Sequence, residues 1–200
     1  MIEATLIASG ASKIAGCDEA GRGPCAGPLV VAAVIFQFPL HKSLEDIKDS
    51  KELSEGKREN LYDLIVENAL TYSIIEISPA EIDEKGLHKC NLEGMRRAIS
   101  TLKTEPDYVL TDGYPIDGIE TPTLAVWKGD QVSITVGAAS ILAKVYRDRR
   151  MVVLDKKYPG YGFADHKGYI TARHTEALNE LGVTEIHRKS FANIKEIINS

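Results

Sequence analysis

Hydrophobic side chains along the chain follow two patterns, and the first of them predicts β-strands. Leu29–Phe36 is a continuous apolar run rich in β-branched residues, which is typical of a strand buried on both faces. Residues 72–77 alternate between apolar and polar positions, as a half-buried strand does. Shorter apolar segments of strand length occupy residues 14–17, 108–110 and 123–126. The Gly- and Pro-rich stretch between residues 14–17 and Leu29–Phe36 favours an antiparallel pair of these two segments.

The second pattern places an apolar residue every three to four positions and predicts helices. Ser54 and Ser78 are suited to cap two of these helices, and Pro79 suits the first turn after Ser78. The longest predicted helix covers residues 136–157, which are rich in Ala and Leu. The other predicted helices cover residues 57–68, 91–102, 172–181 and 192–198, with a loop at 158–171. Strands that are first paired and then interleaved with helices predict an α/β domain around a central mixed five-stranded sheet.

Length and composition place the chain among ordinary globular proteins. The 200 residues are 44% hydrophobic and 26% charged, which fits one domain with a short appendage. We find no apolar run long enough to cross a membrane and no secretory signal near the N-terminus. The three cysteines form no CxxC motif, so neither a disulfide framework nor a cysteine zinc site is expected. These features predict a soluble cytoplasmic protein.

The distribution of charge leaves two interpretations open. The net charge of −5 argues weakly against nucleic acid as a partner. Residues 144–173, however, hold eight basic side chains against three acidic ones. Such a stretch is either a solvated helix face or a surface that meets phosphate groups.

Acidic residues follow three of the predicted strands, which raises a specific possibility for chemistry. They are Asp18 with Glu19, Asp112, and Asp130. Each of them could simply end a strand or cap a helix in solvent. Carboxylates that gather at one edge of a sheet repel one another, and divalent cations with oxygen ligands relieve that repulsion. Two such ions can support the hydrolysis of a phosphodiester.

Six blocks of sequence, in order along the chain, closely resemble the bacterial form of the ribonuclease HII family. They begin with the GCDEAGRGPCAGP segment at residues 16–28 and the DSKEL segment at 49–53. The further blocks are DG at 112–113, KGD at 128–130 with AASILAKV at 138–145, YPGYGF at 158–163 with HKGY at 166–169, and HRKSF at 187–191. The resemblance implies a ribonuclease H-like fold with a small C-terminal helical extension. It divides the chain into a catalytic domain at residues 1–157 and a substrate-contacting loop and helices at residues 158–200.

The resemblance also implies an activity and a metal site. Members of the family hydrolyse RNA in RNA–DNA hybrids and nick duplex DNA on the 5′ side of single embedded ribonucleotides, leaving a 3′-hydroxyl and a 5′-phosphate. Their four carboxylates carry over to Asp18, Glu19, Asp112 and Asp130, which would hold two divalent ions, Mn²⁺ or Mg²⁺. Asp148 also lies in a matching block, but it falls inside a predicted helix beside Arg147, where an ion pair is expected.

Residues for substrate recognition carry over in the same way. Gly21, Arg22 and Gly23 would read the 2′-hydroxyl together with Tyr169. Phosphate contacts are expected from Ser50, Lys51, Lys144 and Arg147, and His166 would touch the substrate or order its loop. Because Asp18 and Glu19 are adjacent, both can reach one site only if the chain turns there, which the nearby glycines permit.

Other readings of the sequence remain to be tested. Ribonuclease HIII shares the acidic signature, but only 17 residues precede Asp18, so its additional N-terminal domain is not expected. A hybrid-binding protein without catalysis and another metal nuclease, such as a transposase or an exonuclease, are the further alternatives. The chain ends in IKEIINS, without the glutamine and aromatic residues of a sliding-clamp peptide. We expect a monomer that binds RNA–DNA hybrids and ribonucleotide-containing duplex DNA.

Overall fold

The computed structural model describes residues 2–49 and 53–199, which fold around one sheet. Ser50 and Lys51, two of the expected phosphate contacts, lie outside the described residues. The strands are β1 (Ile14–Ala20), β2 (Leu29–Phe36), β3 (Ala69–Ile77), β4 (Tyr108–Asp112) and β5 (Thr123–Val126). The helices are α1 (Ile2–Ala8), the 3₁₀ helix η1 (Lys42–Asp49), α2 (Glu55–Asn68), α3 (Pro79–Lys85), α4 (Leu87–Ser100), α5 (Gly129–Val132), α6 (Ile134–Lys157), α7 (Phe163–His166), α8 (Ala172–Leu181) and α9 (Ala192–Asn199).

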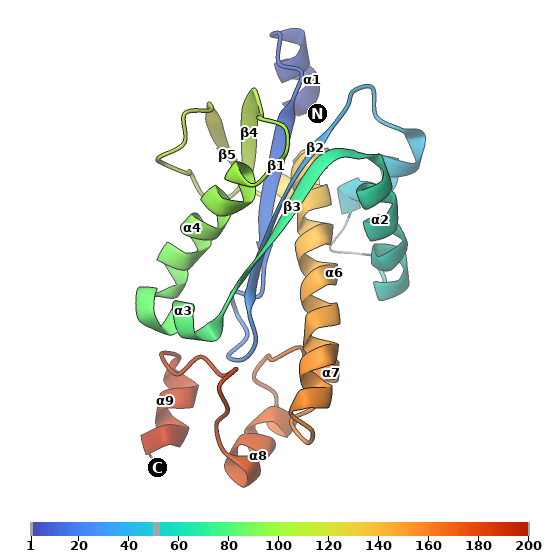
Figure 1. Cartoon of the computed structure of the whole chain (residues 1–200). Helices are drawn as coiled ribbons and strands as arrows, with labels where there is room; N and C mark the ends of the chain where they lie inside the picture. The colour runs from blue at the N-terminus through green and yellow to red at the C-terminus, as the bar shows by residue number, and fades with distance from the viewer. Residues whose placement is uncertain (1, 50–52, 200) are drawn as a thin grey trace.

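The five strands form a mixed sheet in the order β3-β2-β1-β4-β5. The first three strands are antiparallel neighbours, whereas β4 and β5 run parallel to β1. This arrangement confirms the expected α/β fold with a five-stranded mixed sheet (Figure 1). The carboxyl ends of β1, β4 and β5 therefore meet at one edge, where ligands bind in many open α/β sheets.

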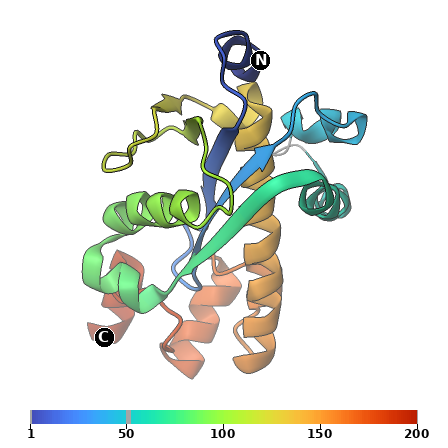
Figure 2. The same ribbon diagram turned by 45° about the horizontal axis from the view of Figure 1, so that its top comes forward.

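Helices cover both faces of the sheet, with α4 on one face and α6 together with α2 on the other (Figure 2). The fully buried strand β2 contributes alternate side chains to the two cores, as its continuous apolar sequence predicts. A glycine sets the closest approach of α6 to the sheet. A side-chain carbon on Gly16 would lie only 2.0 Å from the backbone of Thr135, so any other residue there would push α6 away from β1.

The last part of the chain packs beneath the sheet, at the end of the molecule opposite α1 (Figure 1). Side chains of α7, α8 and α9 form a small core with the end of α6 and with the segment that connects β1 to β2. The predicted loop at 158–171 contains the short helix α7, which the sequence analysis did not anticipate. The boundary drawn at residue 157 coincides with the end of α6 and stays a prediction.

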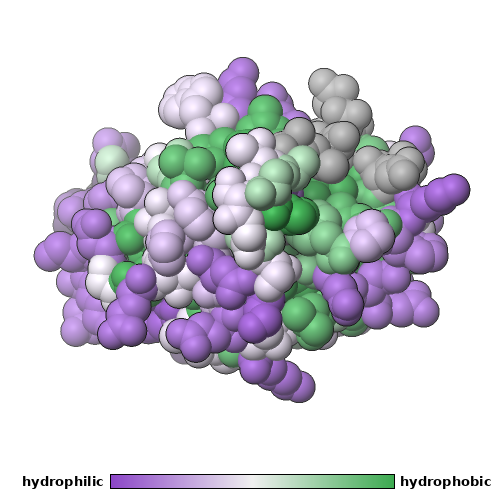
Figure 3. Space-filling model, turned by 90° about the horizontal axis from the view of Figure 1, so that it is seen from above, coloured by the Kyte–Doolittle hydropathy of each residue, from purple (hydrophilic) through white to green (hydrophobic). Residues whose placement is uncertain are grey.

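Helix α1 was not predicted, and a buried carboxylate attaches it to the rest of the protein. Glu3 is fully buried, and its Oε1 accepts hydrogen bonds from Ser133 Oγ (2.7 Å), Thr135 N (3.0 Å) and Thr135 Oγ1 (3.1 Å). An acidic group at the first turn of α6 also interacts favourably with the helix dipole. Seen from above, this end of the molecule gathers hydrophobic side chains in its middle and hydrophilic ones around them (Figure 3).

We expect Glu3→Ala to lower the free energy of unfolding by about 2 kcal/mol, because three donors at the start of α6 lose a charged acceptor. Urea unfolding at neutral pH would measure the change. Glu84→Ala, which removes an exposed carboxylate from α3, is the matched control and should change stability little. Equal effects of the two substitutions would contradict this account of Glu3.

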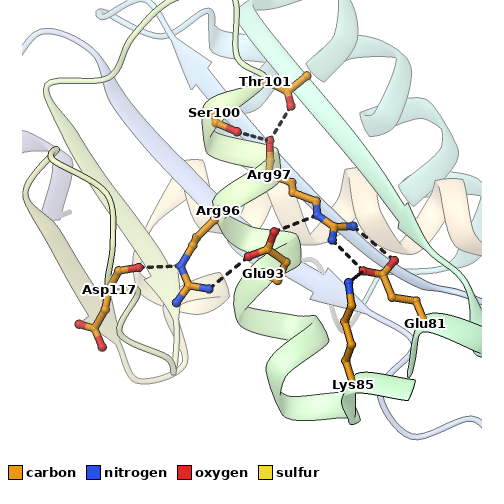
Figure 4. Close-up of polar contacts among 8 residues, drawn as sticks. All are labelled: Glu81, Lys85, Glu93, Arg96, Arg97, Ser100, Thr101 and Asp117. Atoms are coloured by element: carbon orange, nitrogen blue, oxygen red, sulfur yellow. Dashed lines mark hydrogen bonds and ion pairs between the residues drawn. The ribbon is translucent and has the colours of Figure 1, made fainter. Parts of the chain in front are cut away.

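A network of ion pairs ties α3, α4 and the loop after β4 together (Figure 4). Arg97 of α4 binds Glu81 of α3 at 2.7 Å and Glu93 at 3.1 Å. Arg96 donates to the carbonyl of Asp117 at 2.6 Å and so holds the loop that follows β4. This loop carries Tyr114, which contacts the acidic site described next.

Among the described residues, no helix is both long and apolar enough to cross a membrane.

Candidate active site

Asp18 and Glu19 lie on a regular part of β1, where the sequence analysis expected the chain to turn. Both residues pair with β2, Asp18 with Ala32 and Glu19 with Val31, and the strand continues to Ala20. Their side chains therefore point to opposite faces of the sheet. Asp18 faces α6, where Ser140 lowers its pKa, and Glu19 faces α4. The expectation of a turn is wrong, and the reason why both carboxylates still share a site lies in β4.

Strand β4 ends beside these two residues, which leaves the edge of β1 open. The last parallel pair joins Cys17 to Thr111, and Asp112 is the final residue of β4. Asp112 interacts electrostatically with both Asp18 and Glu19, although these two lie on opposite faces of β1. Beyond the end of β4, no strand among the described residues pairs with this edge of β1, so the three carboxylates converge around it.

The convergence leaves an excess of negative charge. Burial raises the pKa of Asp18 well above its ordinary value, and repulsion from Glu19 and Asp112 raises it further. Burial also raises the pKa of Glu19, which Arg22 lowers and Asp112 raises. The Arg22 guanidinium lies 3.4 Å from Glu19 Oε1. One arginine at the margin does not neutralise three carboxylates.

Asp130 is delivered to the same edge by the KGD segment. The Gly129 N–H donates to Asp112 Oδ1 at 2.7 Å, which fastens the start of α5 to the end of β4. Lys128 adopts a left-handed conformation with φ of 53°, so the chain turns sharply between β5 and α5. Asp130 follows Gly129, and its side chain is buried. The structure thus brings Asp112 and the backbone of Asp130 together, as their places after two parallel strands predict.

The donor set fits a divalent cation. Glu19 Oε2 is buried and has no hydrogen-bond partner among the described residues, although the buried amide of Asn91 lies near enough to lower the pKa of Glu19. Within residues 2–49 and 53–199, no group of three or more His, Cys, Asp or Glu side chains is arranged to hold a metal ion by itself. Mg²⁺ commonly takes only one or two carboxylates and completes its shell with water and substrate phosphates, so an open acidic edge suits it.

A cavity of about 280 Å³ opens next to Glu19 on the side of α6. Its lining includes four expected substrate residues: Gly21, Lys144, Arg147 and Tyr169. Ser140 of α6 and Arg58 of α2 also line it, and the sequence analysis had missed both. Arg58 lies outside the recognised blocks and carried no signal, whereas Ser140 lies inside one of them.

Lys144 and Arg147 were both expected to contact phosphate, but they lie in different surroundings. Lys144 is partly exposed and pairs with Asp148 at 2.8 Å, so Asp148 forms its ion pair with Lys144 and not with Arg147. Arg147 is 1% exposed, and its guanidinium donates to backbone carbonyls. A direct contact of Arg147 with a substrate phosphate is therefore wrong, because its donors are turned inward.

The residues expected to read the 2′-hydroxyl lie together. Tyr169 is 48% exposed, and a side-chain carbon on Gly23 would lie 3.3 Å from its ring. Arg22 donates to the hydroxyl of Tyr114 at 2.5 Å and stacks over that ring. His166 uses both ring nitrogens within its own loop, accepting from the N–H of Gly168 and donating to the carbonyl of Tyr161. Of its two expected roles, the structure shows His166 ordering the loop.

Solved structures of known proteins share this fold. The crystal structure of ribonuclease H2 from Pyrococcus horikoshii OT3 matches with a TM-score of 0.84 and 32% identity, over 94% of this chain and 97% of that one. Ribonuclease HII from Archaeoglobus fulgidus, solved as a complex with PCNA, matches with a TM-score of 0.70 and 29% identity, over 88% of this chain and 93% of that one. The fold and the acidic edge define a nuclease of the ribonuclease H type.

The sequence comparisons narrow this class of nuclease to one family. A curated ribonuclease HII from Salinispora arenicola is 52% identical over 98% of this chain and 73% of its own length. The family model for ribonuclease HII matches residues 15–194, and the chain belongs to the ribonuclease HII family.

Proposed function

We propose that this protein is an endonuclease that hydrolyses RNA in RNA–DNA hybrids and nicks duplex DNA on the 5′ side of single ribonucleotides, leaving a 3′-hydroxyl and a 5′-phosphate. The observation that carries the proposal is the placement of one cavity. Glu19, which belongs to the acidic edge with Asp18 and Asp112, lines this cavity, and so do Gly21 and Tyr169. A phosphate at the carboxylates would thus have its neighbouring sugar at the reading residues.

Asp18, Glu19, Asp112 and Asp130 are the residues that would hold the metal, and we propose two divalent ions, Mn²⁺ or Mg²⁺. Bound divalent ions at such a site activate a water molecule and stabilise the leaving oxygen. The protein's own part is to bring the acidic groups together at one edge of the sheet. It does so by ending β4 at Asp112 and by binding Asp112 to Gly129.

Recognition of the sugar falls to residues 21–23 and to Tyr169. In the described part of the chain, the N–H groups of Arg22 and Gly23 have no protein acceptor, which leaves them available to a ribose hydroxyl or a phosphate oxygen. The 2′-hydroxyl is the group that separates RNA from DNA at one nucleotide. Lys144 and Arg58 at the cavity, together with the predicted contacts Ser50 and Lys51, would bind backbone phosphates.

The three alternatives from the sequence are answered by two observations. The family match favours ribonuclease HII over ribonuclease HIII and over other metal nucleases of the same broad fold. A hybrid-binding protein without catalysis is disfavoured because a binder gains nothing from buried carboxylates that repel one another. The PCNA complex belongs to the Archaeoglobus fulgidus protein. For this chain we propose a monomer that binds RNA–DNA hybrids and ribonucleotide-containing duplex DNA.

A nicking assay tests the proposal. A labelled DNA duplex with one ribonucleotide is incubated with the protein in Mg²⁺, in Mn²⁺ and in EDTA, beside an all-DNA duplex of the same sequence. We expect a single nick immediately 5′ of the ribonucleotide, which requires a divalent ion and is absent from the all-DNA duplex. Binding without any nick under either ion would support the non-catalytic alternative. Cleavage only within runs of ribonucleotides would refute the reading of a single 2′-hydroxyl.

A further inference from the structure

Arg188, in the segment between α8 and α9, is fully buried beneath the segment that reads the sugar. Its guanidinium donates to the carbonyls of Gly21 (2.6 Å) and Arg22 (3.1 Å), and twice to the carbonyl of Gly27 (3.0 and 3.1 Å). These acceptors lie at both ends of the connection between β1 and β2. One side chain from the end of the chain therefore fixes the path of residues 21–27.

Arg147 of α6 binds the same segment from the other side and links it to a second loop. It donates to the carbonyls of Ala26 (3.1 Å) and Pro28 (2.9 Å). Its remaining nitrogen donates to the carbonyl of Lys167 at 2.9 Å, two residues before Tyr169. Arg147 thus holds the Gly-Arg-Gly segment and the tyrosine loop at a fixed separation.

Burying these two cations is costly, which argues that packing alone does not explain them. Neither guanidinium forms an ion pair within the part of the chain that the structure describes. Burial lowers the pKa of Arg188 to about 9, with a further contribution from Arg147, so that it still carries its charge at neutral pH. Apolar side chains of similar volume commonly serve a core as well or better. What an apolar side chain cannot do is hold several carbonyls in one plane, as the guanidinium fork does.

The backbone around Arg147 is shaped to receive it. Gly21 has a φ of +95°, and a side-chain carbon there would lie 2.0 Å from Arg147 Nε. The guanidinium therefore packs directly against the first glycine of the reading segment. A shift of the arginine would move that glycine and the two N–H groups that follow it.

We propose that Arg147 and Arg188, together called the arginine clamp, are positioning residues that determine how well the enzyme distinguishes ribose from deoxyribose. The inference rests on the proposed function, because it concerns the site that reads the sugar. The clamp touches neither the substrate nor the carboxylates. It acts by holding the N–H groups of Arg22 and Gly23 at a fixed distance from Tyr169, and small displacements of positioning groups have large kinetic effects.

The test compares Arg188→Met, Arg188→Lys and Arg147→Met with the wild-type chain. Two quantities are measured: kcat/KM for the single-ribonucleotide duplex, and the ratio of Kd values for that duplex and its all-DNA counterpart in EDTA. We expect kcat/KM to fall by roughly 10- to 100-fold and the Kd ratio to approach one. Arg188→Lys keeps the charge but not the planar fork, so it should behave like Arg188→Met.

Leu154→Ala is the matched control for lost stability. Leu154 lies on α6, two turns beyond Arg147, and belongs to the same small core, but it touches none of the carbonyls. We expect it to lower the Tm while keeping the wild-type Kd ratio. Amide hydrogen exchange of residues 25–27, whose N–H groups donate to the carbonyls of Gly168 and Ile186, should accelerate in the arginine variants and stay slow in Leu154→Ala.

The outcomes separate this inference from the proposed function. Arginine variants with a wild-type Kd ratio and slow exchange at residues 25–27 would overturn the clamp, and so would an equal loss of the ratio in Leu154→Ala. If the wild-type chain fails to nick or to prefer the ribonucleotide, the proposed function fails. Hydrogen exchange then still decides whether the two arginines fix the segment.

Discussion

Replacing Asp18 with asparagine is expected to stabilise the metal-free protein while removing its nuclease activity. Asp18 is buried, and Glu19 and Asp112 repel its charge, so its pKa is raised in the folded state. The charged form therefore costs folding free energy above the ordinary pKa of an aspartate. Asparagine keeps the shape without the charge, and we expect a gain of about 1–2 kcal/mol at pH 8 in EDTA. The loss of one metal-holding carboxylate should reduce kcat by roughly 10³-fold.

Urea unfolding in EDTA, combined with the nicking assay, measures both effects on the same preparation. Asp107→Asn provides a control with the opposite sign for stability. The Asp107 carboxylate accepts hydrogen bonds from Ser12 and Lys13, which lower its pKa, so neutralising it should destabilise the protein without affecting cleavage. If Asp18→Asn unfolded at lower urea than wild type, the proposed excess of negative charge would be wrong.

Lowering the pH from 7.5 to 4.5 is expected to destabilise the C-terminal part of the protein through a pair of buried histidines. His174 Nδ1 donates to the carbonyl of Tyr169 at 2.9 Å, and His187 Nδ1 accepts from the N–H of Thr184 at 2.9 Å. The two Nε2 atoms lie 3.1 Å apart, and because Nδ1 of His187 accepts, its Nε2 carries the proton that it donates to Nε2 of His174. A further proton would place two N–H groups face to face.

Burial and the neighbouring His174 lower the pKa of His187 to about 4, from an ordinary value of 6.5. Between these values the unfolded chain binds a proton that the folded chain does not. Neutral His187 therefore does not reduce the free energy of unfolding above pH 6.5. As the pH falls toward 4, the free energy of unfolding decreases by up to about 3 kcal/mol. Urea unfolding at several pH values would show this slope. The His187→Gln variant should show a flatter dependence of stability on pH. Replacing the exposed His41 by Gln should leave the wild-type dependence unchanged. Equal slopes in all three proteins would exclude the histidine pair as the source of the pH dependence.

Regular elements with strong local signals were predictable from the sequence. The apolar run of β2 and the capping serines of α2 and α3 are local features, and Ser54 and Ser78 accept the expected hydrogen bonds from Lys57 and Glu81. Helix α1 was missed because it is short and its anchor, Glu3, binds residues some 130 positions away. Contacts of that range leave no pattern in neighbouring residues.

In the candidate site too, the sequence predicted the residues, but their arrangement depends on long-range contacts. The four carboxylates stood out because each follows an apolar strand and lies in a recognised block. The convergence of Asp18, Glu19 and Asp112 depends on where β4 stops, which fixes how far the edge of β1 is exposed. Sequence reasoning also placed Arg147 on the surface, because it lies in a basic stretch. Only the fold shows that its partners are carbonyls from segments more than 100 positions earlier.

The order in which the chain is synthesised gives the arginine clamp another consequence. Residues 21–28 leave the ribosome early, together with Asp18 and Glu19, but the groups that hold them follow much later. Gly27 N–H donates to the carbonyl of Ile186, and Arg188 follows two residues on. A nascent chain can therefore pair β1 with β2 long before its sugar-reading segment is fixed. If the arginine clamp acts as we propose, selectivity for ribose depends on a residue that is synthesised near the end of the chain.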